Sequence, residues 1–443
     1  MSETAVEHYL TEQARLAPDT GPSWLREQRR AAAETFSRLG FPTLRNEDWK
    51  YTDVRPITKR SFRITQDPAP EPESSWLDAL RFPELDCHEL IFINGRHAAR
   101  SSRLDGLEDD ITIESLGNML QQQPDRLETY LNRYNNTGKN GFVALNTAFM
   151  HEGAVILIPD NVQMAKPLHL IFLSDHQEEP HVSLPRNLIV LGNNSRATVI
   201  ESYFGVDDAE YFTNTNTEVI LNNGAALEHY KIQREGLKGY HVGTLQVRQQ
   251  RDSRMESHSI SLGGRLARND IDVGLADTGA EVFLNGLYMA DKRQHVDNHT
   301  RIDHLSPHTT SVENYRGILN GHGRGVFNGK VMVHKDAQKI SADQSNANLL
   351  LSNDAEVDTK PELEIYADDV QCSHGATTGQ LDEDMLFYLR SRAISEEVAR
   401  NLLTFAFADD VITRLRLKPL RDQLEYLVVG QLPDSEQIRE FIQ

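Results

Sequence analysis

The chain has 443 residues, with 46 Lys and Arg against 66 Asp and Glu, and its formal net charge is −20. This acidity disfavours nucleic acids and anionic membrane surfaces as partners, because both attract basic protein surfaces. The chain has two cysteines, Cys87 and Cys372, too few for a disulfide framework. It shows no secretory signal and no apolar run of about 18 residues, so we expect a soluble, cytoplasmic globular protein.

Residues 1–85 are expected to form an N-terminal helical domain with a linker. Ser23 is a candidate N-cap of a helix, and Gly40 and Pro42 can end that helix. The proline-rich segment 66–75 (QDPAPEPESS) is typical of a linker or surface loop.

Residues 86–375 are expected to form a β core, with a helical insertion near 113–150. Short β-type runs follow one another here, separated by Gly and Asn turns, which predicts a sandwich, a barrel or a β-solenoid. Similar turn sequences end at five alanines: Ala197, Ala225, Ala280, Ala337 and Ala355. Their gaps of 28, 55, 57 and 18 residues are too uneven to establish a solenoid repeat.

Residues 376–443 are expected to form a C-terminal helical domain, with the strands ending at Cys372. A helix is predicted after Asp382, and a longer one after Ser395, whose hydroxyl is a good N-cap. Glu396 and Glu397 would lie in the first turn of that longer helix, where the helix dipole favours carboxylates.

Four histidines lie close together, at positions 295, 299, 304 and 308. On a helix, His295 and His299 would form an i, i+4 metal-binding pair. The β-branched neighbours favour strands instead, so the preferred interpretation is a polar ladder on a sheet face.

The segment 321–331 (GHGRGVFNGKV) invites comparison with a phosphate-binding loop. The spacing fails, because Arg324 stands where the first glycine belongs and Val331 where Ser or Thr would bind magnesium. No nucleotide is therefore expected to bind this chain.

The sequence Cys372-Ser373-His374 is the strongest candidate site. In extended backbone the side chains of Cys372 and His374 project to the same side. Thiolate and imidazole together suit a soft or borderline metal, but two ligands cannot close a tetrahedral site. The site would then need ligands from another chain or an exogenous thiol. A structural Cys–His pair and a cysteine nucleophile remain as alternatives.

Several segments resemble the SufB/SufD family of iron–sulfur cluster assembly proteins. The resemblance is clearest in residues 358–389 (DTKPELEIYADDVQCSHGATTGQLDEDMLFYL) and 46–54 (NEDWKYTDV), and it covers essentially the whole chain. The HGATTGQLD continuation and the lack of additional N-terminal cysteines make the chain more similar to SufD than to SufB.

The resemblance implies a right-handed parallel β-helix flanked by N- and C-terminal helical domains. It further implies that the chain pairs with a SufB-like chain through the last coils and binds a SufC-like ABC ATPase through the C-terminal helices. A nascent iron–sulfur cluster would form at the shared interface, with His374 implicated and Cys372 as its neighbour. The candidate contacts for the ATPase are four apolar residues: Leu402, Phe405, Phe407 and Val411.

The leading hypothesis is therefore a non-catalytic assembly subunit. The alternatives are a SufB-like or homodimeric cluster scaffold, a β-helix enzyme acting on polysaccharides, and a thiol peptidase built on Cys372.

Overall fold

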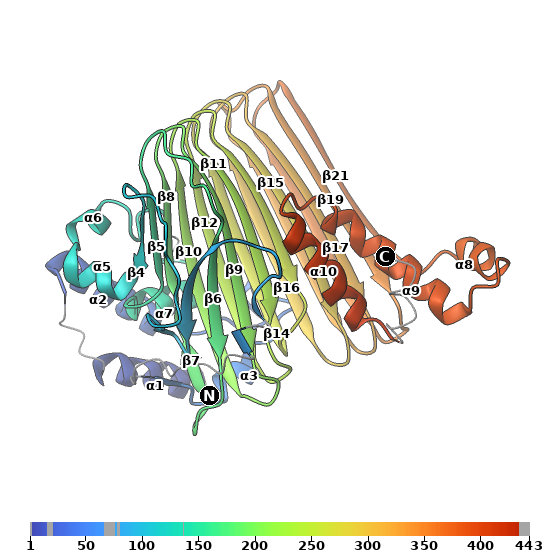
Figure 1. The fold of residues 1–443 in the computed structure, drawn as a ribbon, viewed down its shortest axis with the longest axis horizontal. Helices are drawn as coiled ribbons and strands as arrows, with labels where there is room; N and C mark the ends of the chain where they lie inside the picture. Colours follow the sequence, from blue (N-terminus) through green and yellow to red (C-terminus); the bar gives the residue numbers. More distant parts are fainter. Residues whose placement is uncertain (1, 16–20, 66–75, 78–79, 136, 434–443) are drawn as a thin grey trace.

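The computed structural model describes residues 2–15, 21–65, 76–77, 80–135 and 137–433, so the predicted linker at 66–75 lies outside the described residues. The chain forms a parallel β-solenoid with helices before and after it in the sequence (Figure 1). The predicted mainly β fold, a parallel β-helix flanked by helices, is thus confirmed.

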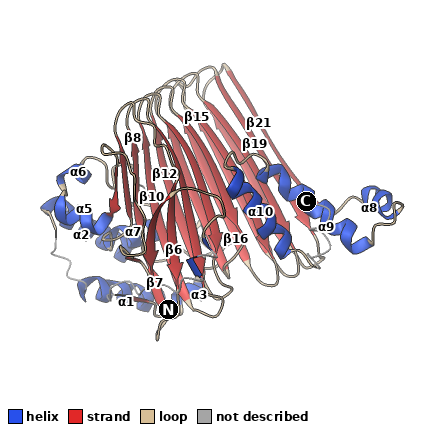
Figure 2. Ribbon diagram, viewed as in Figure 1, coloured by secondary structure: helices blue, strands red, loops and turns tan. Residues whose placement is uncertain are grey.

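Each coil of the solenoid contributes one strand to each of two sheets, which face each other across the interior (Figure 2). The first sheet contains β4 (Thr112–Ser115), β5 (Ala154–Ile158), β8 (Arg186–Leu191), β10 (Tyr211–Leu221), β12 (Tyr240–Gln249), β14 (Leu266–Leu275), β16 (His295–His304), β18 (Arg324–Val333) and β20 (Glu356–Ile365). In addition, β7 (His181–Ser183) pairs with β10, and β1 (Arg63–Ile64) pairs with β7.

The second sheet contains β3 (Arg96–His97), β2 (His88–Ile93), β6 (Leu168–Ser174), β9 (Arg196–Gly205), β11 (Ala226–Arg234), β13 (Arg254–Ser261), β15 (Glu281–Ala290), β17 (Thr310–Leu319), β19 (Ile340–Leu350) and β21 (Val370–Gly379). Alternate residues of every strand point into the interior, which is apolar at one edge and polar towards the centre of the coils.

From β9 to β19, a residue with a left-handed backbone lies one or two residues before each strand of the second sheet. Asn194, Gly224, Asp252 and Gly279 occupy this place before β9, β11, β13 and β15, with φ between 53° and 74°. Asn, Asp and Gly tolerate this conformation best, and so the Gly- and Asn-rich turns mark successive coils.

The coil length varies, which explains why the alanine spacing did not establish the repeat. Tyr240 pairs with Leu266, whereas Val155 pairs with Leu188, so from β5 onward a coil takes from 26 to 33 residues. The alanines at 197, 225, 280 and 337 all lie at the entry to strands of the second sheet, one or two coils apart. Ala355 instead precedes β20 of the first sheet and breaks the series.

Helices cover the outer faces of the two sheets. The N-terminal part contains α1 (Ser2–Arg15), α2 (Ser23–Leu39), a 3-10 turn (Glu47–Trp49), α3 (Arg55–Thr58), α5 (Leu116–Gln122), α6 (Asp125–Glu128) and α7 (Gly141–Ala148). Two of its aromatic side chains reach the first sheet: Phe142 packs on Phe212, and Phe62 packs on Phe212 and Tyr240. Pro22 rather than Ser23 occupies the N-cap of α2.

The C-terminal helices α8 (Glu383–Arg390), α9 (Glu396–Ile412) and α10 (Lys418–Gln431) lie beside the second sheet, and α8 projects beyond it (Figure 1). Ser395 caps α9 as predicted, since its Oγ accepts from the backbone N–H of Val398 at 3.3 Å. Over the described ranges, no helix is both long and apolar enough to cross a bilayer.

Candidate functional site

Cys372 and His374 lie on β21, the last strand of the second sheet. The strands therefore do not stop at Cys372, as the sequence suggested, but continue to Gly379. The stretch GATTG lacks the apolar alternation of a covered strand because β21 is an exposed edge. Cys372 pairs with Ala342 and His374 with Gln344, both buried inside the solenoid. The two side chains thus share the interior face, as the extended backbone predicted.

The thiol of Cys372 is half-buried at the mouth of the solenoid. It packs against a small apolar cluster that includes Val331, Ile340 and Ala342. Burial raises the pKa of this thiol above its ordinary value. The intervening Ser373 points to the other face, where its hydroxyl donates to Asp343 at 2.5 Å. His374 is exposed and available to a ligand from outside.

Among the residues that the structure describes, the two strands that end the solenoid, β20 and β21, are paired on one side only. At the opposite end, the antiparallel strands β3 and β4 terminate the sheets. The edge strand β20 carries charges and Pro361, features that discourage further pairing. The strand β21 (VQCSHGATTG) has neither a charged residue nor a proline. Its free backbone groups are open to another strand.

The site is incomplete as a metal centre. Within the described part of the chain, no three His, Cys, Asp or Glu side chains gather closely enough to hold a metal ion. Cysteine and histidine are the ligand types that iron–sulfur clusters use, and Cys372 and His374 supply one of each. Any metal ion or cluster bound by Cys372 and His374 would therefore need further ligands from another molecule.

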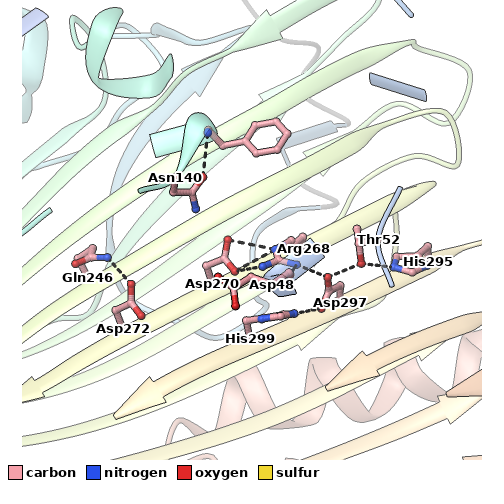
Figure 3. Close-up of polar contacts among 11 residues, drawn as sticks. Asp48, Thr52, Asn140, Gln246, Arg268, Asp270, Asp272, His295, Asp297 and His299 are labelled. Carbon is pink, nitrogen blue, oxygen red and sulfur yellow. Dashed lines mark hydrogen bonds and ion pairs between the residues drawn. The ribbon is translucent and has the colours of Figure 1, made fainter. Parts of the chain in front are cut away.

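Of the four clustered histidines, only His295 and His299 share an outer sheet face, as the preferred interpretation of a polar ladder requires. His295 and His299 lie on the outer face of β16 on either side of Asp297, and Figure 3 shows all three in one polar network. His299 Nε2 lies 3.0 Å from Asp297 Oδ1, and His295 Nε2 lies 2.8 Å from the hydroxyl of Thr52. This network ties the N-terminal segment to the solenoid.

The other two histidines belong to the interior and to a turn. His304 is buried and bonds to the hydroxyls of Thr309 and Ser311 at 2.7 and 2.9 Å. His308 has φ 58° and occupies the left-handed turn position before β17. The segment 321–331 lies in a turn and β18, without the helix that a phosphate loop would precede.

Asp272, on the same outer face, gives a pH-dependent prediction. Burial, and then the neighbouring Asp270 carboxylate, raise the pKa of Asp272 to about 6. An unfolded aspartate titrates near 3.9, so the folded state binds this proton more tightly and loses stability as pH rises from about 4 to 6. Asp272 is half-buried, and we expect Asp272→Asn to raise the free energy of unfolding of the protein by about 1–2 kcal/mol at pH 7.5, and by far less near pH 4. Denaturant unfolding at both pH values checks this, and a pH-independent difference would contradict it.

The four residues predicted to contact an ATPase lie on α9, on the side of this helix that packs against the solenoid and α10. Val411 is 0% exposed and packs against the second sheet. It anchors α9 on its own chain and is not available as a contact surface, which corrects the prediction at this position. Leu402, Phe405 and Phe407 are half-buried and pack partly against the same cluster. A partner could reach only their outer edges.

The neighbouring helix α8 carries the exposed apolar surface that the sequence analysis missed. Met385, Phe387 and Tyr388 are 55%, 75% and 55% exposed, while Leu386 alone of this run is buried. The signal was present in the run MLFYL, because a short helix with one covered side cannot bury five consecutive apolar residues. We call Met385, Phe387 and Tyr388 the α8 patch.

Comparisons with known proteins assign the family. The SufBD core domain of the SUF system for FeS cluster assembly matches residues 172–407, and the SufBD protein N-terminal region matches residues 2–170. An iron–sulfur cluster assembly SufBD family protein of Synechocystis is 34% identical over 95% of this chain and 93% of its own length. The iron–sulfur cluster assembly protein SufD of Escherichia coli is 32% identical over 89% of this chain and 90% of its own. The chain therefore belongs to the SufBD family of iron–sulfur cluster assembly proteins.

Proposed function

We propose that this chain is a SufD-type, non-catalytic subunit that pairs with a SufB-type chain and helps to build a nascent iron–sulfur cluster at their interface. The observation that carries the proposal is the unprotected edge strand β21, with two cluster-type ligands, Cys372 and His374, at the mouth of the solenoid. The similarity to Escherichia coli SufD over most of both chains supports the SufD-type assignment.

Pairing along β21 would complete both the sheet and the site. A partner strand would satisfy the free backbone groups of this edge through main-chain hydrogen bonds. It would also bring its own side chains beside Cys372 and His374, where the described residues of this chain supply no third ligand. Metal binding and assembly would then be coupled, since the complete ligand set exists only in the complex.

We further propose that the ABC-type ATPase of the system docks on the C-terminal helices through the α8 patch. Exposed aromatic residues at this density are typical of the centre of a protein interface. The helix projects beyond the second sheet, so a partner can reach it without displacing α9 or α10 (Figure 1). ATP hydrolysis by that partner would then act on the last coils through the helices packed beside them.

Replacement of Phe387 tests this docking surface. Phe387 is 75% exposed, so Phe387→Asp should leave the fold intact and lower the affinity for the ATPase by at least about tenfold. Co-purification through a tag on this chain gives the readout.

The matched control is Leu44→Asp, which introduces the same charge at an exposed apolar residue, 46% exposed, in the N-terminal region. Equal recovery of the ATPase with both variants would remove the α8 patch from the interface.

A further inference from the structure

Behind His374, two buried polar residues stand in line on successive strands of the second sheet. Glu313 on β17 pairs in register with Gln344 on β19, and Gln344 pairs with His374 on β21. In-register residues of a parallel sheet share one face, and neighbouring strands lie about 4.8 Å apart. The three side chains therefore form one row on the interior face that ends at the mouth of the solenoid.

The amide of Gln344 is held in one orientation. Its Nε2 donates to Glu313 Oε2 at 2.5 Å, and both residues are 1% exposed. Because the NH₂ group donates this bond to the carboxyl of Glu313, the carbonyl oxygen of Gln344 occupies the other branch of the amide. The strand β21 lies on the side of β19 opposite to β17 and Glu313.

The carbonyl oxygen of Gln344 has no hydrogen-bond partner among the described residues, although it is fully buried. Buried polar atoms without a partner are costly and rare, and this one calls for a donor. The next residue along the row, His374, has two ring nitrogens, and the neutral imidazole carries a proton on one of them.

We propose that Gln344 is a positioning residue for His374. Its carbonyl oxygen accepts a hydrogen bond from one imidazole N–H, so the other ring nitrogen is unprotonated and can bind iron. The inference rests on the proposed role of His374. Histidines that bind metals ordinarily donate their second nitrogen to such a partner, which fixes both the tautomer and the ring. Glu313 acts one step further back, by orienting the amide.

The experiment follows the imidazole directly, without any cluster. Full-length protein labelled with ¹⁵N-histidine is examined at pH 8 by long-range ¹H–¹⁵N correlation, and the signals of His374 are identified by their loss in His374→Gln. We expect one dominant tautomer in the parent protein. In Gln344→Met, which preserves the volume and removes the amide, both tautomers should be populated.

The control is Asn348→Leu. Asn348 is also a buried amide on β19, but it pairs in register with Thr378 and not with His374. It should leave the signals of His374 unchanged. Should Gln344→Met not fold, Glu313→Gln replaces it, because a neutral amide no longer fixes the orientation of Gln344, and the tautomer preference should weaken. Identical His374 signals in the parent and in the folded variant would overturn the inference.

Iron binding by the assembled complex separates this inference from the proposed function. We expect Gln344→Met to weaken iron binding by about tenfold, the lower range for loss of a partner behind a metal-binding histidine. A complex that loses iron with His374→Ala but not with Gln344→Met would overturn the role of Gln344 alone. Iron retained with His374→Ala would overturn the proposed role of His374 as a ligand, while the tautomer measurement would still decide whether Gln344 orients its ring.

Discussion

His374→Ala is expected to leave the complex assembled and to lower its iron and sulfide content by about tenfold or more. The side chain is exposed at the mouth of the solenoid, so its removal costs little in packing. In the proposed function it nevertheless removes one of the two cluster ligands, Cys372 and His374, that the described residues would offer. Even the loss of a partner behind a ligand costs a metal site roughly 10–100-fold in affinity, and loss of the ligand itself should cost at least as much.

The neighbouring positions on β21 supply the controls. Ser373→Ala changes the opposite face, where the hydroxyl bonds to Asp343, and should leave iron and sulfide unchanged. Cys372→Ser should have a milder effect than His374→Ala if the partner chain supplies the main thiolates. Iron and acid-labile sulfide per complex give the readout. Unchanged loading with His374→Ala would remove His374 from the mechanism.

Arg268→Met is expected to produce the largest loss of stability. The guanidinium is 2% exposed and lies 3.7 Å from the ring of Trp49 in the N-terminal segment (Figure 3 shows its polar partners). It donates to Asp297 Oδ2 at 2.6 Å, to Asp270 at 2.8 Å and to the carbonyl of Asp48 at 2.7 Å. Removing one member of a buried ion pair costs about 3–5 kcal/mol, because the remaining carboxylates stay buried without their counter-charge.

The release of the N-terminal segment should accompany this loss. Hydrogen exchange of the backbone amides of residues 47–53 should speed up far more in Arg268→Met than elsewhere in the chain. The control is Arg301→Met on the neighbouring strand β16. Arg301 forms an ion pair with Asp303, and its side chain is 43% exposed. That pair should be worth less than about 1 kcal/mol. Equal destabilisation by the two variants would show that the buried network does not fasten the segment.

Acid should weaken the same network. Burial alone would raise the pKa of Asp297, but Arg268 and then His299 hold it well below its usual range. A carboxyl with a depressed folded-state pKa stabilises the protein above its unfolded pKa of about 3.9 and loses that contribution as pH falls below it. The network is therefore intact throughout the neutral range.

The sequence predicted those parts of the fold that depend on local signals. The turns at Gly224 and Asp252 require a left-handed backbone, which favours Gly, Asn and Asp, so the turns between strands could be recognised in the sequence. Ser395 could be recognised as a helix cap because its partner is only three residues away. The repeat itself was not recognised because coils of 26 to 33 residues share no fixed period.

The candidate site was predicted only in part, since the rest depends on register between distant residues. Cys372 and His374 are two residues apart, so their common face follows from the strand alone. Gln344 and Glu313 join their row only through the pairing of β17, β19 and β21, which no local pattern discloses. Val411 looked like a free apolar residue because the sequence does not say that α9 lies on the second sheet.

The subunit composition of the native assembly tests the central claim most directly. The protein is purified gently from its own cells through a tag on this chain, and the mass of the intact assembly is measured by native mass spectrometry. The proposed function predicts recovery with a SufB-type chain and with subunits of the ABC-type ATPase. Recovery as a homodimer, without the ATPase at any salt concentration tested, would contradict it.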